Sequence, residues 1–296
     1  MTDHPIFTGA ASALITPLNA QGLDFESLGR LIDWQIEKGI KALVIAGTTG
    51  EGSTLSDEEH KAVLKYSVER TAGRVPVIAG TGSNDTEYAI ALTKYACEVG
   101  CDAMLVVTPY YNKATQKGLV KMFCAIADAS TKPIIVYNIP GRTGVNVEPA
   151  TFLELAKHPR ITAVKEASGN FSKIAEILRL VGDKMDVYSG NDDQIVPLLA
   201  LGGSGVISVL SNVMPTETVE MCEAFFRGET AKAAKMQIEY LDLINDLFCE
   251  VNPIPVKAAM AHLGFGENYV RMPLTVMEPE HEAKLVAEMK RLVVIE

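Results

Sequence analysis

A lysine and a tyrosine 28 residues apart are the first side chains in this sequence whose types and spacing suggest chemistry. Lys165 lies in ITAVKEAS, residues 161–168, where its apolar neighbours predict a buried strand. A lysine enclosed by apolar walls loses hydration, so its pKa falls and the neutral amine can attack a carbonyl carbon to form a Schiff base. Tyr137, late in the preceding apolar run, could move protons during formation and dehydration of the carbinolamine.

The same lysine also has a purely structural interpretation. Charged lysines are rarely buried without a partner, and an interior carboxylate such as Glu166 or Asp192 could supply one. For a lone lysine on a strand, this ion pair is the commoner case. The side chains that favour chemistry here also follow apolar runs: Tyr137, Thr48, Tyr111 and Arg142.

Eight apolar runs must position these residues, and they are predicted to be strands: 9–18, 41–51, 75–82, 103–111, 133–142, 161–168, 185–192 and 205–212. Each run is continuous rather than alternating, which is typical of parallel strands covered on both faces. Helical patterns separate most of them, including 28–39 and 56–73, where Ser56 and Glu59 form a capping-box signature. The repeat predicts an α/β fold, a (β/α)8 TIM barrel, with a doubly wound open sheet as the alternative.

The sequence after residue 215 is helical and contains no further predicted strand. We therefore predict a catalytic barrel over residues 1–215 and a C-terminal helical extension over 216–296. No linker rich in Ser, Gly or Pro separates them, so the extension should pack on the barrel. Catalytic groups of such barrels lie at the C-terminal strand ends, where this sequence carries GTTGE, TPYYN, YNIPGRTG, KEASG and SGND.

Composition excludes several classes of function. The formal net charge of −10 argues against a nucleic-acid partner. Five cysteines without a framework spacing indicate free thiols in a reducing compartment. The N-terminus resembles no signal peptide and no apolar run is long enough for a membrane span, so we expect a cytoplasmic protein without a membrane partner.

No cofactor is expected from the motifs. The five histidines are scattered, which argues against a metal site, and neither a P-loop nor G-x-G-x-x-G occurs. The turn at Thr48 and Thr49 could offer hydroxyl and N–H groups to a carboxylate, or could simply be a glycine-containing turn with a helix cap. Arg142 could clamp a carboxylate in bidentate fashion, or could be a surface arginine.

Six motifs together resemble the dihydrodipicolinate synthase family, from about residue 6 to the C-terminus: GTTGE (47–51), TPYYN (108–112), YNIPGRTG (137–144), VKE (164–166), SGND (189–192) and NPIPVKAAM (252–260). The lysine and tyrosine alone would fit any pyruvate-dependent aldolase. The second threonine of GTTGE and the arginine of GRTG favour the synthase.

The resemblance implies a reaction that needs no cofactor beyond a covalent imine with Lys165. Pyruvate forms the imine and becomes an enamine, which attacks the aldehyde of L-aspartate 4-semialdehyde. The product cyclises to 4-hydroxy-tetrahydrodipicolinate and leaves the lysine. This is a step of lysine and diaminopimelate biosynthesis.

The resemblance also implies residue roles and an assembly. The implied roles are proton donor and acceptor for Tyr137, proton relay for Thr48 and Tyr111, pyruvate binding for Thr49 and the Ile207 backbone, semialdehyde binding for Arg142, and lining of the site for Gly190. The expected assembly is a homotetramer, a dimer of dimers, in which Tyr111 reaches into the site of a neighbouring subunit.

A lysine effector site is only partly matched. The matching positions are Asn84, His60 and Tyr110. The position of the family's glutamate is Tyr88, and a second histidine position is Asp57. Glu87 is adjacent, but one step along a helix turns a side chain by about 100°. We therefore expect weak or absent inhibition by lysine.

Two other functions remain possible from the sequence alone. One is a sister pyruvate-dependent aldolase, similar to N-acetylneuraminate lyase or to the keto-deoxy sugar acid aldolases. The other is a non-catalytic metabolite-binding barrel, which would be expected to lack Lys165 or Tyr137.

Overall fold

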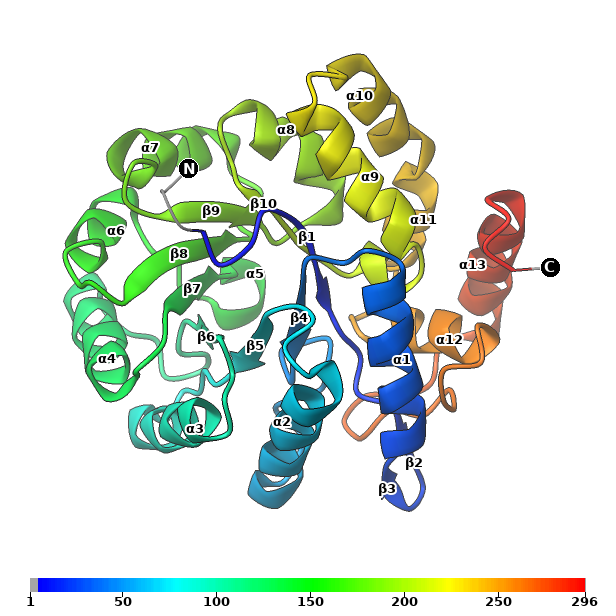
Figure 1. The fold of residues 1–296 in the computed structure, drawn as a ribbon, viewed down its shortest axis with the longest axis horizontal. Helices are drawn as coiled ribbons and strands as arrows, with labels where there is room; N and C mark the ends of the chain where they lie inside the picture. Colours follow the sequence, from blue (N-terminus) through cyan, green and yellow to red (C-terminus); the bar gives the residue numbers. More distant parts are fainter. Residues whose placement is uncertain (1–4, 296) are drawn as a thin grey trace.

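The computed structural model describes residues 5–295, and its centre is a closed barrel of parallel strands (Figure 1). The order around the barrel is β1-β10-β9-β8-β7-β6-β5-β4, with β1 closing against β4. The barrel strands are β1 (Gly9–Ala13), β4 (Ala42–Ile45), β5 (Val77–Gly80), β6 (Ala103–Val107), β7 (Ile134–Asn138), β8 (Ile161–Glu166), β9 (Asp186–Ser189) and β10 (Gly205–Ser208). The predicted TIM barrel and its eight strands are confirmed.

Side chains alternate between the interior of the barrel and the surrounding helices because successive residues of a strand point to opposite faces. On β7, Ile135 and Tyr137 belong to the inner cluster, whereas Ile134 and Val136 belong to the outer one. Both faces are therefore apolar, which explains the continuous runs in the sequence. The predicted runs extend beyond the strands because their polar ends form the loops at the mouth.

Helices surround the barrel in the predicted alternation. They are α1 (Phe25–Glu37), α2 (Asp57–Thr71), α3 (Thr86–Glu98), α4 (Gln116–Ala129), α5 (Pro140–Thr143), α6 (Pro149–Leu155), α7 (Phe171–Val181) and α8 (Ile195–Ala200). The predicted capping box of α2 is present, with Ser56 and Glu59 each accepting from the other's backbone amide. Helix α1 begins earlier than predicted because the Asp24 side chain caps it at Ser27. A small hairpin, β2 (Leu18–Asn19) with β3 (Gly22–Leu23), was not predicted.

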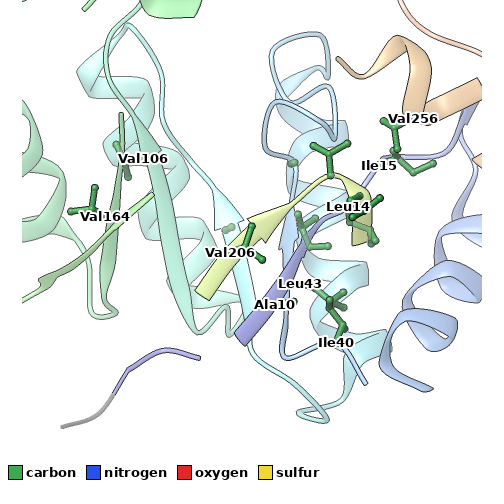
Figure 2. Close-up of a cluster of buried hydrophobic side chains, with 14 of the residues drawn as sticks. Ala10, Leu14, Ile15, Ile40, Leu43, Val106, Val164, Val206 and Val256 are labelled. Atoms are coloured by element: carbon green, nitrogen blue, oxygen red, sulfur yellow. The ribbon is translucent and has the colours of Figure 1, made fainter. Parts of the chain in front are cut away.

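Five further helices follow β10: α9 (Pro215–Phe226), α10 (Thr230–Glu239), α11 (Leu241–Asp246), α12 (Ile254–His262) and α13 (Pro279–Arg291). Helix α9 packs against β1 and α10. Val256 of α12 belongs to the same buried cluster as Leu14 and Ile15, which follow β1 (Figure 2). The helical segment after residue 215 therefore packs on the barrel, while the boundary between residues 1–215 and 216–296 stays a prediction. Within residues 5–295, no helix is both long and apolar enough to cross a membrane.

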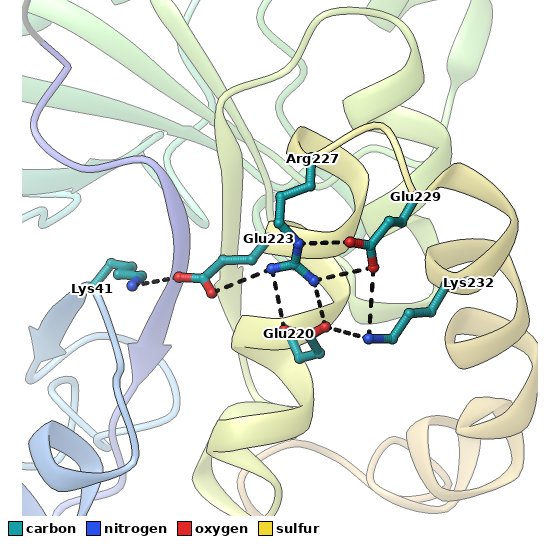
Figure 3. A network of polar contacts seen from close by, with 6 residues as sticks. All are labelled: Lys41, Glu220, Glu223, Arg227, Glu229 and Lys232. Atoms are coloured by element: carbon teal, nitrogen blue, oxygen red, sulfur yellow. Dashed lines mark hydrogen bonds and ion pairs between the residues drawn. The ribbon is translucent and has the colours of Figure 1, made fainter.

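A network of surface charges joins α9 and α10 to the segment before β4 (Figure 3). Arg227 is paired with Glu220 at 2.6 Å and with Glu229 at 2.9 Å, and Lys41 is paired with Glu223 at 2.6 Å. All of these side chains are at least about a third exposed, so solvent screens each pair and its contribution to stability is small. The buried apolar cluster, rather than this network, holds the helices in place.

We predict that Gly205→Ala destabilises the barrel where β10 meets β1. Gly205 has a φ of +155°, and an added Cβ would lie 2.0 Å from the carbonyl oxygen of Gly9. The free energy of unfolding should fall by about 3 kcal/mol or more, because neither backbone can move without breaking hydrogen bonds between β1 and β10. Gly118→Ala in α4 is the control, since its Cβ meets nothing nearer than 3.4 Å. Denaturant unfolding measures both, and equal stabilities of the two variants would contradict the prediction.

Candidate active site

Lys165 and Tyr137 lie side by side across the β7–β8 pairing. The register pairs Tyr137 with Lys165, and the Lys165 Nζ lies 4.3 Å from the centroid of the Tyr137 ring. Because Ala163 faces the barrel interior and Val164 the helices, alternation also turns Lys165 inward. Lys165 is only 6% exposed, and Tyr137 is 5% exposed. The structure therefore brings together the amine and the phenol that the sequence singled out.

Burial makes the Lys165 side chain easier to deprotonate. It lowers the pKa of Lys165 to about 8, since a charged amine is poorly solvated there; the Asp192 charge opposes this shift and the Arg142 charge adds to it. At pH 7 a pKa of 8 leaves roughly a tenth of the amines neutral, against about one in 3,000 for an ordinary lysine. Near neutral pH, a larger share of this amine is therefore uncharged than for an exposed lysine.

Glu166 and Asp192 are the two carboxylates that could have paired with Lys165. Among residues 5–295, neither forms a direct ion pair with it. Glu166 accepts hydrogen bonds from the Asn138 amide at 2.9 Å and from the Ser168 N–H at 2.7 Å. Asp192 accepts from the backbone N–H groups of Val209 and Leu210, each at 2.9 Å. Asp192 therefore acts on the charge of Lys165 at a distance, and its two hydrogen bonds hold the loop after β10 in place.

The Tyr137 phenol stays protonated over the physiological range. Burial raises its pKa to about 12, while the charge of Arg142 and a hydrogen bond with Thr48 oppose the rise. The same three residues line a cavity of about 490 Å³ at the barrel mouth. Lys165 is not among the lining residues, but its amine lies against the Tyr137 ring. The Tyr137 side chain therefore contacts both the cavity and the Lys165 amine.

Gly190 keeps the space around Lys165 free. An added Cβ there would lie 2.7 Å from the Ala167 Cβ and 3.1 Å from the Lys165 Cε. Ile207 is buried in the inner cluster on β10, opposite Ala11 of β1. Both residues lie within the barrel as the predicted roles require, and the roles themselves stay predictions.

The turn after β4 carries Thr48 and Thr49 in a strained backbone. Ala46 and Glu51, which flank it, have φ values of +54° and +53°. Left-handed conformations are uncommon for residues other than glycine, and they concentrate at functional sites. Thr49 is buried, and its hydroxyl accepts a hydrogen bond from the Asn252 side chain at 3.0 Å.

Three residues near the site were missed by the sequence interpretation: Asn252, Lys257 and Arg271. Lys257 forms a fully buried ion pair with Glu51 of the threonine turn, at 2.5 Å. Arg271 donates its backbone N–H to the other Glu51 oxygen at 3.0 Å and pairs with Glu59. The available signal was a lysine in the apolar segment NPIPVKAAM, which resembles the pattern that drew attention to Lys165.

Arg142 and Tyr111 occupy the rim in different ways. Arg142 lies on α5, directly after β7, where its guanidinium lines the cavity and donates to the Asn252 carbonyl at 3.1 Å. Tyr111 is 93% exposed and has a φ of +69°. It does not join Lys165 and Tyr137 within the single chain, so its place in the relay stays a prediction that depends on a neighbouring subunit.

The positions that resemble a lysine effector site lie near the same cavity. His60, Tyr88 and Tyr110 line it, whereas Glu87 is exposed. Burial lowers the pKa of His60, which contacts the Gly80 carbonyl at 2.9 Å. The side chain facing the cavity at the glutamate position is thus a phenol, and weak inhibition by lysine stays a prediction. Asn84 lies next to this group, where its carbonyl accepts from Asn112 at 2.9 Å.

Within residues 5–295, no group of three or more His, Cys, Asp or Glu side chains could hold a metal ion. The five cysteines of this range are free thiols in the structure.

The family model described as the Dihydrodipicolinate synthetase family matches residues 6–292. The chain belongs to this family. A 4-hydroxy-tetrahydrodipicolinate synthase of Acetivibrio thermocellus is 54% identical over 273 residues, which cover 92% of this chain and 93% of the relative. This membership confirms the predicted family and enzyme class, a lyase, and favours the synthase over a sister aldolase or a non-catalytic barrel.

Two solved structures of dihydrodipicolinate synthases share the fold. The enzyme of Aquifex aeolicus is 45% identical and superposes with a TM-score of 0.96, covering 97% of this chain and 99% of that one. The Acinetobacter baumannii enzyme, solved in complex with pyruvate, is 42% identical with a TM-score of 0.95, covering 97% and 99%. The fold of this family member therefore follows that of its relatives along nearly the whole chain.

We predict that imine formation with pyruvate accelerates as the pH rises through about 8, because only the deprotonated Lys165 attacks the carbonyl. Asp192→Asn removes a negative charge that favours the ammonium form, so the midpoint should move to lower pH. Arg142→Met removes a positive charge that disfavours it, so the midpoint should move to higher pH. Adduct formation trapped with cyanoborohydride and followed by mass spectrometry measures the three profiles. Shifts in the same direction for both variants would contradict this electrostatic account.

Proposed function

We infer that this chain condenses pyruvate with L-aspartate 4-semialdehyde to give 4-hydroxy-tetrahydrodipicolinate, and we propose that it does so through an imine at Lys165. The observation that carries the proposal is the buried amine beside the Tyr137 phenol, which lines a cavity at the mouth of the barrel. The reaction is a step of lysine and diaminopimelate biosynthesis.

The proposed chemistry needs only groups of the protein and its two substrates. The neutral Lys165 amine adds to the pyruvate keto carbon, and loss of water gives the imine. Loss of a proton from the methyl group gives the enamine, whose carbon bonds to the aldehyde carbon of the semialdehyde while the aldehyde oxygen takes a proton. The amine of the semialdehyde then attacks the imine carbon, closes the ring and releases Lys165. No metal or organic cofactor takes part in this proposal.

Tyr137 is the proposed proton donor and acceptor of these steps. Its high pKa keeps the phenol protonated, so it can donate to the leaving hydroxyl of the carbinolamine and then recover the proton. The hydrogen bond with Thr48 supplies the next member of the relay. Tyr111 would complete it from a neighbouring subunit, which is supported by its exposure on the single chain.

Two carboxylates require recognition, one on each substrate. We propose that Thr49 and the Ile207 backbone bind that of pyruvate, and that Arg142 at the rim binds that of the semialdehyde. Gly190 lines the site beside Lys165. We further propose a cytoplasmic homotetramer, a dimer of dimers, with Asn84, His60 and Tyr110 as a lysine effector site that binds lysine weakly.

We predict that pyruvate and borohydride together modify Lys165. Reduction of the imine converts it to a stable secondary amine, so peptide mapping should find the adduct on residue 165. Lys165→Arg should abolish both the adduct and the activity, because a guanidinium stays protonated. Lys257→Arg is the matched control, since Lys257 is equally buried but is paired with Glu51. An active enzyme that carries no adduct, or carries it on Lys257, would contradict the proposed function.

We predict that Arg142→Ala raises the KM for the semialdehyde much more than the KM for pyruvate. Loss of a charge-assisted contact with a carboxylate corresponds to about 2–4 kcal/mol, or about 30- to 1,000-fold. Arg160→Ala is the control, because the Arg160 guanidinium contacts the Ala127 carbonyl at 3.4 Å and does not line the cavity. Steady-state kinetics with each substrate varied in turn gives the two constants. Equal increases for both substrates would refute this role of Arg142.

A further inference from the structure

Asn252, in the segment between α11 and α12, contacts both halves of the proposed substrate site. Its side-chain Nδ2 donates to the Thr49 hydroxyl at 3.0 Å, and its backbone carbonyl accepts from the Arg142 guanidinium at 3.1 Å. Asn252 is only 5% exposed, so water does not compete strongly for these bonds. A residue of the C-terminal extension thus joins the turn after β4 to the helix after β7.

The direction of the Asn252–Thr49 hydrogen bond decides what the hydroxyl can offer a ligand. A threonine hydroxyl has one proton and two lone pairs. Because Thr49 accepts from Asn252, one lone pair is used and the proton points elsewhere. The structure gives that proton no acceptor among residues 5–295. The hydroxyl is therefore set to donate, which is what a carboxylate requires.

We propose that Asn252 is a positioning residue that fixes the Thr49 hydroxyl as a hydrogen-bond donor to the pyruvate carboxylate. The inference rests on the proposed function, in which Thr49 binds pyruvate. Asn252 acts through Thr49 rather than by touching the substrate. Without Asn252, the Thr49 hydroxyl rotates freely, and part of the binding free energy of the carboxylate is lost in fixing its orientation.

The buried charges beside Asn252 hold it against the threonine turn. Lys257, five residues further along the chain, is paired with one oxygen of Glu51, and the Arg271 N–H binds the other. Glu51 ends the turn that carries Thr49, so both partners of the hydrogen bond are tied to one carboxylate. A buried ion pair is costly to break, because removing one partner leaves an uncompensated charge. The ion pair between Glu51 and Lys257 thus connects the turn that carries Thr49 to the segment that carries Asn252.

A double-mutant cycle tests whether Asn252 acts through Thr49. Asn252→Ala should raise the KM for pyruvate about 10-fold, as expected for a lost orientation of one hydrogen bond to a charged group. The KM for the semialdehyde should change by less than about 2-fold, because the backbone carbonyl that holds Arg142 remains. In a Thr49→Val background, which lacks the hydroxyl, Asn252→Ala should change the pyruvate KM by less than about 2-fold. In a Thr49→Ser background the full effect should persist. Equal effects in the valine and wild-type backgrounds would overturn the proposal.

Asn252→Asp tests the donor role with almost no change in shape. An ionised aspartate cannot donate, so it takes the Thr49 proton and should raise the pyruvate KM at least as much as Asn252→Ala. A wild-type pyruvate KM in this variant would show that an acceptor at position 252 suffices, and would overturn the inference. Thermal unfolding of each variant accompanies the kinetics. If the wild-type protein forms no trapped pyruvate adduct, both the proposed function and this inference are overturned. If the adduct forms normally but the effects of the Asn252 and Thr49 substitutions on the pyruvate KM are additive, only the inference is overturned.

Discussion

The low polarity around Lys165 is the constraint on which the rest of this structure depends. An amine among apolar side chains and an aromatic ring is poorly solvated as a cation, and the neutral form gains accordingly. A closed barrel supplies such an environment, because its interior is filled with side chains and its outer face is covered by helices. The small residues Ala11, Ala42, Ala103 and Ala163 make room inside for the larger Tyr137, Tyr188 and Lys165.

Charges near the site change the pKa of Lys165 further, but they do not cancel the effect of burial. Asp192 favours the protonated amine and Arg142 disfavours it, and Asp192 forms no direct ion pair with Lys165 in the described residues. A direct ion pair would keep the amine protonated and unreactive. Lys257 is also buried and does form such a pair, with Glu51, and this pair holds the threonine turn.

The fold and the centre of the site could be predicted from the sequence, but the connections between distant segments could not. Continuous apolar runs and their polar ends are local patterns, so they predicted the strands, the barrel and the pairing of Tyr137 with Lys165. Asn252 and Lys257 contact residues about 200 positions away, and no local pattern contains such a contact. The proposed place of Tyr111 in the relay depends on a second chain, which the fold of one chain does not supply.

A stacked aromatic pair fills part of the barrel interior. Phe7 precedes β1 and stacks on Tyr188 at 4.2 Å, and the Tyr188 hydroxyl donates to the Phe7 carbonyl at 2.8 Å. Both rings belong to the cluster of side chains that fills the barrel interior, together with Tyr137. In the proposed function, pyruvate bonds to the buried amine first, and the semialdehyde is then added from the side of the cavity that Arg142 lines.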